Sequence, residues 1–361
     1  MKYGKNLIKT FVWILTLING LLLAISNFAL VIDPATWAFP QFLGLAFPIL
    51  FFLNLLALFF WLAALNIRII FPGIILLTSL LHVSKYLQFT AQRIPDPEAN
   101  VFKVGSLNTK LFGHWEGREF IDTALFNIRM ANFDIVCMQE AYIMGENKDS
   151  LLSTVLINTK FNDFNYTRLN PGKPYGMILL TKHKILKAME IELPNTTANM
   201  VMYYDLLINS DTIRLYNVHL QSIRFKPADY TFMDGQDNDS SMLKSHNIYK
   251  QMAMAYETRV KQARKIKEHI NNSPYPVVLC GDLNDVPMSY TYQLLIESPQ
   301  RLDAFREAGN GLESTYQGLF PSFRIDYIFT SKDIYTLQYS SSGDIPSDHK
   351  LVSATLQYKK N

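Results

Sequence analysis

Three long apolar segments in the first hundred residues constrain this chain more than any other feature of its sequence. They cover residues 7–32, 42–65 and 69–89, and the second of them contains no charged residue. About 20 apolar residues are enough for a helix to cross the hydrocarbon core of a bilayer. None of the segments has the polar face that a helix on a soluble core would show. The pattern therefore predicts an all-α transmembrane region, residues 1–92, with three spanning helices.

A cleaved signal peptide is the alternative explanation for the first segment. The apolar part of a signal peptide usually has about 7–15 residues, whereas this segment has 26 residues with one charge, Lys9, near its start. Two further apolar segments follow it. A membrane helix is therefore favoured over a leader that is removed.

The basic residues near these segments predict their orientation. Lys2, Lys5 and Lys9 lie at the start of the first segment, and Arg68 lies in the second connection. Cytoplasmic connections carry an excess of Lys and Arg, so we expect the N-terminus inside the cell and, after three crossings, the rest of the chain outside. This corresponds to a multi-pass protein of the inner (cytoplasmic) membrane with an extracytoplasmic C-terminal domain.

The charge balance of that C-terminal domain bears on its partners. Residues 1–99 hold six of the 34 Lys and Arg residues and three of the 31 Asp and Glu residues, so the remainder holds 28 of each. Nucleic-acid binders usually have a basic excess, because they neutralise phosphates. Neutrality disfavours a high-affinity nucleic-acid groove without excluding a nuclease. No protein partner can be inferred.

Residues 101–361, which follow a linker with two prolines at residues 93–100, alternate strand and helix patterns. Apolar residues recur with helical spacing in residues 119–130 and 249–270. Eight segments are rich in the Val, Ile, Tyr and Leu typical of strands, namely residues 101–107, 133–140, 175–182, 200–208, 212–220, 275–282, 324–330 and 350–358. This mixture predicts an α/β domain in which helices pack outside layered sheets.

Two cysteines, Cys137 and Cys280, fall inside apolar runs, and the sequence contains no C-x-x-C motif. Buried cysteines commonly behave as small apolar side chains, so we expect two buried thiols. A disulfide between neighbouring strands stays open, because sequence cannot establish the distance between the residues.

Polar side chains occur repeatedly where the predicted apolar strands end or begin. They are Asn108, Glu140, His219, Asp282, Asn284, Asp326, Asp348 and His349. A single Asp after a strand is usually part of a turn, but this repetition predicts that the set converges on one site. A long unpatterned segment, residues 224–247, follows His219, and loops of this length are often functional.

The chemistry of this set suits a metal-assisted hydrolysis. Glu140, Asp348 and the amide of Asn108 are the hard oxygen ligands that Mg²⁺ or Mn²⁺ prefers, and no Cys/His cluster has zinc-ligand spacing. Asp282 could align and deprotonate a water molecule. The two histidines could donate protons or bind phosphate, and Asp326 could orient His349. Together these residues fit the hydrolysis of a phosphoester.

Seven motifs of the C-terminal domain occur in an order that resembles a known superfamily. They are "SLNTK", "MQE", "GMILLTKHKI", "NVHL", "GDLND", "RIDYIF" and "SDHKLV", between residues 101 and 358. This order resembles the endonuclease/exonuclease/phosphatase superfamily, which includes pancreatic-type deoxyribonucleases, abasic-site endonucleases, neutral sphingomyelinases and inositol polyphosphate phosphatases. The resemblance implies a four-layer α/β sandwich of two packed mixed sheets flanked by helices.

The resemblance also implies roles for the residues of the set. Glu140 would bind the metal with Asn108 and Asp348 nearby. Asp282 and Asn284 would act on the nucleophilic water and the phosphate. His219 and His349 would contact phosphate and move protons, with Asp326 behind His349. Lys110 departs from the pattern, because some family nucleases have an acid there, and any second metal contact from this position is lost.

These observations predict a membrane-anchored, divalent-metal-dependent phosphoester hydrolase that acts outside the cytoplasm. The membrane region and the neutral catalytic part favour a lipid headgroup, hydrolysed at a phosphodiester, as the substrate. An extracytoplasmic endonuclease or exonuclease is the alternative among enzymes. A non-catalytic membrane binding protein is a further alternative, which the complete polar set disfavours.

Overall fold

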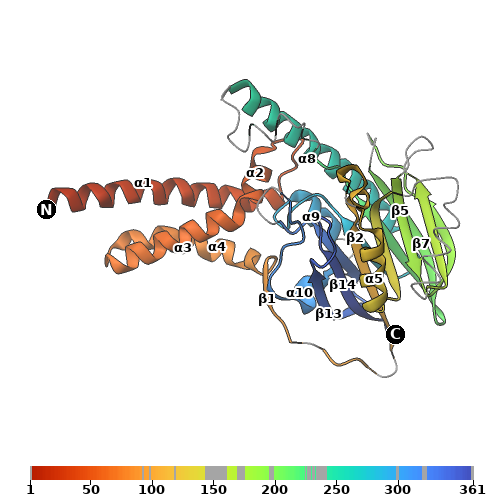
Figure 1. Ribbon diagram of the computed structural model, residues 1–361. Coiled ribbons are helices and arrows are strands. Elements are labelled where there is room, and N and C mark those ends of the chain that lie inside the picture. Colours follow the sequence, from red (N-terminus) through yellow and green to blue (C-terminus); the bar gives the residue numbers. More distant parts are fainter. Residues whose placement is uncertain are drawn as a thin grey trace.

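A group of apolar helices projects from one end of a layered α/β domain (Figure 1). The computed structural model describes residues 2–91, 93–96, 99–117, 119–142, 161–168, 175–194, 199–223, 225, 229, 232, 242–297, 301–318 and 323–358. The two parts are called the helical region, residues 2–83, and the catalytic domain, residues 100–358, below.

Two six-stranded sheets form the centre of the catalytic domain. The first has the order β13 (Ile334–Ser342), β14 (Leu351–Tyr358), β2 (Asn100–Asn108), β3 (Ile135–Tyr142), β5 (Tyr175–Thr181) and β4 (Asp163–Arg168). The second has the order β10 (Arg301–Asp303), β12 (Asp326–Ser331), β9 (Val277–Asp282), β8 (Asp211–His219), β7 (Met200–Ile208) and β6 (Lys184–Glu190). Both sheets are mixed, because β2 pairs with β3 and β8 pairs with β9 in parallel while the other pairs are antiparallel.

Three apolar clusters divide the domain into four layers. One lies between the sheets, a second lies between the β7–β8–β9 face and the helices α8 (Met242–Asn271) and α9 (Tyr290–Ile296), and a third lies under α5 (Ile121–Met130). Every residue of β9 is buried, as expected for a strand that is covered on both faces. The predicted four-layer α/β sandwich is confirmed.

Cys137 and Cys280 lie in the cluster between the sheets as free, buried thiols. Burial, followed by the neighbouring Cys280, raises the pKa of the Cys137 thiol. Both residues therefore contribute to packing as small apolar side chains.

The helical region contains α1 (Lys2–Ser26), η1 (Asn27–Leu30), α2 (Phe39–Leu45), α3 (Phe47–Ala63), η2 (Ile67–Ile69) and α4 (Ile70–Val83). The prediction of one continuous helix over residues 42–65 is wrong, because α2 and α3 meet at a bend of 70°. Pro48 lies in the first turn of α3. A proline starts a helix well there, but it has no N–H with which to continue a preceding one.

The bend changes the number of helices that could cross a membrane. By length and composition, residues Asn6–Leu30 qualify, and the bent pair of α2 and α3 qualifies as a second span if it is counted as one. The third apolar helix, Ile67–Val83, is shorter. The sequence predicted three spanning helices. Among the described residues, only one or two helices are long and apolar enough to cross a membrane.

Candidate active site

Strand register brings three of the predicted site residues together on one sheet. His219 ends β8 and faces Asp282 at the end of the parallel strand β9. Asp326 begins β12 and faces the same Asp282 from the antiparallel side. Gly281 permits the close approach of β8 and β9, because its φ is +141° and a Cβ atom there would lie 2.0 Å from the carbonyl oxygen of Val218.

The other sheet contributes two more of the predicted site residues, Asn108 and Glu140. Asn108 ends β2, and its Nδ2 donates a hydrogen bond of 3.1 Å to Oδ2 of Asp282. Glu140 lies at an irregularity of β3, between Met138 and Ala141, and has a positive φ of +49°. Such bulges re-aim a side chain and are over-represented next to active sites. The two sheets therefore meet at Asp282.

Asp282 is held by hydrogen bonds on both oxygens. Its Oδ1 accepts a bond of 2.7 Å from the backbone N–H of Asn284, and its Oδ2 accepts one of 3.1 Å from Nδ2 of Asn284. The imidazoles of His219 and His349 place Nε2 at 3.9 Å and 3.8 Å from the same Oδ2. Burial raises the pKa of Asp282 above the usual carboxyl range, which suits a carboxylate that must accept a proton.

His349 and Asp326 form a buried pair. Nδ1 of His349 lies 2.9 Å and 3.1 Å from the two carboxylate oxygens of Asp326. Burial by itself would lower the pKa of His349, but the negative charges of Asp326 and Asp282 outweigh it and raise that pKa to about 10. At neutral pH the ring is therefore an imidazolium that can donate a proton from Nε2.

Two buried polar atoms on the side of the site near Glu140 lack a hydrogen-bond partner among the described residues. Nε2 of His219 lies 3.3 Å from Oε1 of Glu140, and Oδ2 of Asp348 lies 3.3 Å from Nζ of Lys110. Nε2 of His219 and Oδ1 of Asp348 are buried and have no hydrogen-bond partner among the described residues. Such atoms are costly unless something else satisfies them. Their chemistry fits a phosphate oxygen at the imidazole and a cation at the carboxylate.

Two residue sets could hold a divalent metal ion. The oxygen donors Asn108, Glu140 and Asp348 line one wall of a shared cavity. The side chains of Asp282, Asp326 and His349 bring one ligand atom each within 4.8 Å of one another. In the second set, both carboxylate oxygens of Asp326 lie within hydrogen-bond distance of Nδ1 of His349. In the first set, Oδ1 of Asp348 has no hydrogen-bond partner among the described residues, so we assign the ion to the first set as a prediction.

Six of the eight predicted residues line one cavity of about 400 Å³, and the other two contact residues that line it. The six are Asn108, Glu140, Asp282, Asn284, Asp348 and His349. Asp326 lies behind His349, and His219 lies between Glu140 and Asp282. The structure thus brings the whole set together, while the role of each member stays a prediction.

A polar bridge beneath this set escaped the sequence analysis. Nε2 of Gln139 donates a hydrogen bond of 2.7 Å to Oδ1 of Asn217, and Nδ2 of Asn217 donates one of 3.2 Å to the carbonyl oxygen of Met138. These two hydrogen bonds join β3 to β8 between the sheets. Asn217 lies two residues before His219, hence on the same face of its strand. This two-residue spacing from His219 was the only sequence signal that could have pointed to Asn217.

The long segment after His219 lies largely outside the described residues. Of residues 224–241, only Phe225, Asp229 and Phe232 are described, and residues 242–247 belong to α8 rather than to a loop. Phe225 lines the cavity.

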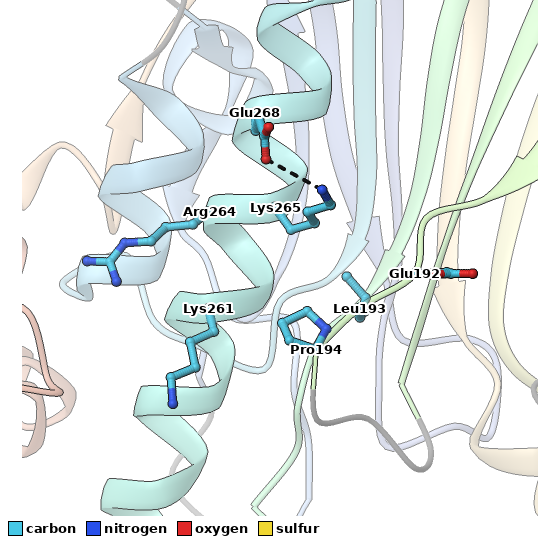
Figure 2. A pocket seen from close by; sticks show the side chains of 7 residues that line it. All are labelled: Glu192, Leu193, Pro194, Lys261, Arg264, Lys265 and Glu268. Atoms are coloured by element: carbon cyan, nitrogen blue, oxygen red, sulfur yellow. Dashed lines mark ion pairs between the residues drawn. The ribbon is translucent and has the colours of Figure 1, made fainter.

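A second, open cavity of about 490 Å³ lies on the outer side of α8 (Figure 2). It is lined by residues 192–194 and by Lys261, Arg264, Lys265 and Glu268. Lys265 pairs with Glu268 at 3.5 Å, and Arg264 pairs with Asp33. None of the strand-end residues lines this cavity, so it is not the candidate active site.

Comparisons with known proteins agree with this geometry. A model of the endonuclease/exonuclease/phosphatase family matches residues 117–349. A second family model, described as a domain of unknown function, matches residues 9–86. No curated protein matches the chain.

Solved structures show the same fold at low sequence identity. An endonuclease/exonuclease/phosphatase family protein from Bacteroides thetaiotaomicron has 15% identity and a TM-score of 0.53, over 73% of this chain and 100% of its own. A relative from Beutenbergia cavernae has 16% identity and a TM-score of 0.52, over 72% of each chain. ANGEL2, a 2′,3′-cyclic phosphatase, has 16% identity and a TM-score of 0.52, over 75% of this chain and 99% of its own.

Proposed function

Because this chain belongs to the endonuclease/exonuclease/phosphatase family, whose members hydrolyse phosphoesters, we propose that it is a membrane-anchored, divalent-metal-dependent phosphodiesterase acting on a lipid headgroup outside the cytoplasm. The observation that carries the proposal is the position of Asp282, which is buried, bonded by Asn108 and Asn284, and flanked by two imidazoles. A water molecule at this carboxylate would lie between a base and a proton donor.

Each residue can then be given a chemical step. Asp282 accepts the proton of the attacking water, which Asn284 helps to orient. His219 donates a hydrogen bond to a non-bridging phosphate oxygen. His349, kept protonated by Asp326, gives its Nε2 proton to the leaving oxygen. Glu140, with Asn108 and Asp348, would hold Mg²⁺ or Mn²⁺, which when bound neutralises charge that develops on the phosphate.

The arrangement of the helical region supports membrane anchoring and orientation. The N-terminus of α1 and the turn between α3 and α4 lie at the end farthest from the catalytic domain (Figure 1). Nη1 of Arg68 in that turn donates 3.4 Å to the carbonyl oxygen of Lys9. The basic residues thus gather at one end and the catalytic domain lies at the other. We propose a multi-pass protein of the inner membrane with its basic end in the cytoplasm.

We also propose a division of the chain into the transmembrane region 1–92, the linker 93–100 and the catalytic domain 101–361. The two family models match residues 9–86 and 117–349 separately, which supports two modules.

The test uses the full-length protein in detergent with Mg²⁺ or Mn²⁺. It is presented with vesicles of phospholipid or sphingolipid, with inositol phosphates and with plasmid DNA. We expect release of a phosphorylated headgroup from one lipid, loss of this release with EDTA, and little release by the His349→Ala variant. Cleavage of DNA with the lipids intact would support a nuclease. A folded protein that binds lipid without hydrolysing any compound would support the non-catalytic alternative.

A further inference from the structure

One residue of the helical region belongs to the wall of the catalytic cavity. Leu45, the last residue of α2, lines the same cavity as Asp282 and His349. We propose that α2 and α8 form an apolar subsite beside the catalytic carboxylate, which binds the hydrocarbon chain of an amphiphilic phosphoester. The inference rests on the proposed function. It adds that the helical region selects the substrate as well as anchoring the protein.

The apolar part of the cavity comes from separate segments of the chain. Leu45 belongs to α2, Met252 and Tyr256 belong to α8, and the remaining apolar or aromatic lining residues are Ile223, Phe225, Val286, Tyr316, Phe323 and Ile325. The predicted site residues Asn108, Glu140 and Asp282 lie at or near strand ends of the same cavity. One cavity therefore offers a polar end for a phosphate and an apolar wall for a hydrocarbon chain, which is the pattern of an amphiphile site.

Contacts on both sides fix α2 against the catalytic domain. The ring of Phe42 stacks on Tyr249 at 4.7 Å and meets Tyr256 edge-on at 5.3 Å. Oε1 of Gln41 accepts a hydrogen bond of 3.2 Å from the backbone N–H of Tyr290. A Cβ atom at Gly44 would lie 2.2 Å from the carbonyl oxygen of Met288. The last turn of α2 is thus held close to the domain, so Leu45 is a fixed part of the wall.

The charged pair in this part of the cavity carries no net charge, and Nη2 of Arg259 and Oδ2 of Asp285 are buried without a hydrogen-bond partner among the described residues. Nη1 of Arg259 lies 3.5 Å from Oδ1 of Asp285, and both side chains are almost completely buried. The guanidinium also lies over the ring of Tyr256 at 4.7 Å. A hydrocarbon chain along Leu45 and Tyr256 would therefore meet an ion pair of zero net charge.

The position of α2 gives such a chain a route from the bilayer. α2 lies between the domain-side end of α1 and the helix α8 (Figure 1). At its start, the exposed rings of Trp37 and Phe39 stack at 5.9 Å. Aromatic residues are enriched where a membrane meets water. An amphiphile with its phosphate at Asp282 could extend its chain past Leu45 toward the hydrocarbon.

The test measures chain-length dependence on soluble probes. Full-length protein in detergent is given 4-nitrophenyl alkyl phosphodiesters from methyl to octyl. Burial of one methylene can raise kcat/KM by up to about fourfold, so we expect a steep rise over the first few carbons. Leu45→Gln and Met252→Gln should lower kcat/KM for the octyl compound about tenfold or more and leave the methyl compound nearly unchanged.

Met254→Gln is the matched control. Met254 lies on the same helix as Met252, but its side chain is 68% exposed and does not line the cavity. It should keep the full chain-length dependence. The apolar subsite would be overturned if Leu45→Gln lowered kcat/KM equally for the methyl and octyl compounds, or if the wild-type kcat/KM did not depend on chain length. Either result would leave the proposed phosphoesterase activity unaffected.

A second readout does not depend on turnover. An octyl phosphonate with a diazirine at the chain end is irradiated with the protein, and the labelled peptides are identified by mass spectrometry. We expect label on peptides that contain Leu45 or Met252, competed by unlabelled octyl phosphonate. Label confined to the outer faces of α1 and α3 would overturn the subsite, whether or not any probe is hydrolysed. Failure to hydrolyse any probe would count against the proposed function and is a separate result.

Discussion

The helical region and the catalytic domain place polar and apolar side chains in opposite ways. In the helical region Thr16, Asn54 and Ser79 are buried, whereas Leu7 and Leu77 are 76% and 70% exposed. In the catalytic domain, valine, leucine and isoleucine fill the layers between sheets and helices. Water-soluble proteins rarely expose large contiguous apolar patches. Under the membrane anchoring that we propose, the helical region would face lipid and the catalytic domain would face water.

The comparison extends to how each region uses an arginine. Arg68 in the helical region is half-buried and lies over the rings of Trp13 and Trp61, at 5.3 Å and 5.2 Å from their centroids. Arg324 in the catalytic domain is paired with Asp303, with both side chains fully buried. Nη1 of Arg324 also donates 3.1 Å to the carbonyl oxygen of Lys85, just after α4. The second arginine therefore links the catalytic domain to the segment that directly follows the helical region.

The Asp303→Ala variant should have the largest effect, because it breaks this link from the domain side. Removing one member of a buried ion pair leaves an uncompensated charge and costs about 3–5 kcal/mol. Tyr292 also loses its acceptor, since its hydroxyl donates 2.8 Å to Asp303. Unfolding of the full chain in detergent measures the loss. Asp344→Ala, at an exposed position, is the control, and a similar small change in both variants would contradict the assigned role.

His349→Ala tests whether the chemistry belongs to the catalytic domain alone. Loss of a positioned proton donor typically lowers the rate by about 10²–10⁴-fold, and we expect about 10³-fold with no change in the helical region. Asp326→Asn should lose less, since Asp326 acts through His349. His269→Ala is the matched control, because His269 does not line the cavity. Its Nδ1 lies 2.8 Å from the hydroxyl oxygen of Tyr216. Comparable losses in both histidine variants would remove His349 from the mechanism.

Glu140→Gln tests the proposed metal site. The change keeps the shape of the side chain and removes its charge, so both metal affinity and charge stabilisation should fall. We expect about a hundredfold loss of kcat and a shift of the Mg²⁺ dependence to higher concentration. Glu268→Gln, at an exposed ion pair on α8, should change neither. Near-normal turnover at low Mg²⁺ would exclude Glu140 as a ligand and favour the cluster of Asp282, Asp326 and His349.

The sequence predicted the central strands of both sheets and missed all of the edges. The eight predicted strands are β2, β3, β5, β7, β8, β9, β12 and β14, while β4, β6, β10 and β13 end the two sheets. Central strands are buried on both faces and have continuous apolar runs. An edge strand such as β6 has no fully buried residue, and lysines interrupt its apolar residues, so it lacks the continuous apolar run of a central strand.

The candidate site divides in the same way. Its strand-end residues could be found from the sequence, because they lie directly after or before the central strands that the apolar runs identify, or at their first or last residue. Leu45, Met252 and Tyr256 could not be found, since their place in the cavity depends on how α2 and α8 dock. The bend before α3 was also missed, although Pro48 gave the local signal for it. Docking of helices on a domain depends on contacts far apart in the sequence, which no local pattern contains.

The smallest predicted effect compares one hydroxyl group in each region. Nε1 of Trp61 donates 3.0 Å to Oγ1 of Thr16 between α3 and α1, and the hydroxyl of Tyr327 donates 2.9 Å and 2.8 Å to the carbonyl oxygens of Asp285 and Arg324. Hydrogen bonds between membrane helices contribute about 0.6 kcal/mol on average, because the unfolded state in lipid also finds partners. A buried carbonyl that loses its donor in a water-soluble domain costs about 1–3 kcal/mol.

Thr16→Val should therefore lower the free energy of unfolding by less than Tyr327→Phe. Both replacements remove one hydroxyl and nearly keep the volume of the side chain, so packing changes little in either. Unfolding of the full chain in lipid–detergent micelles, followed by tryptophan fluorescence for the helical region and by loss of activity for the domain, measures the two changes side by side. A larger loss for Thr16→Val would mean that the helical region is stabilised as a water-soluble core is, and the contrast between the two regions would then fail.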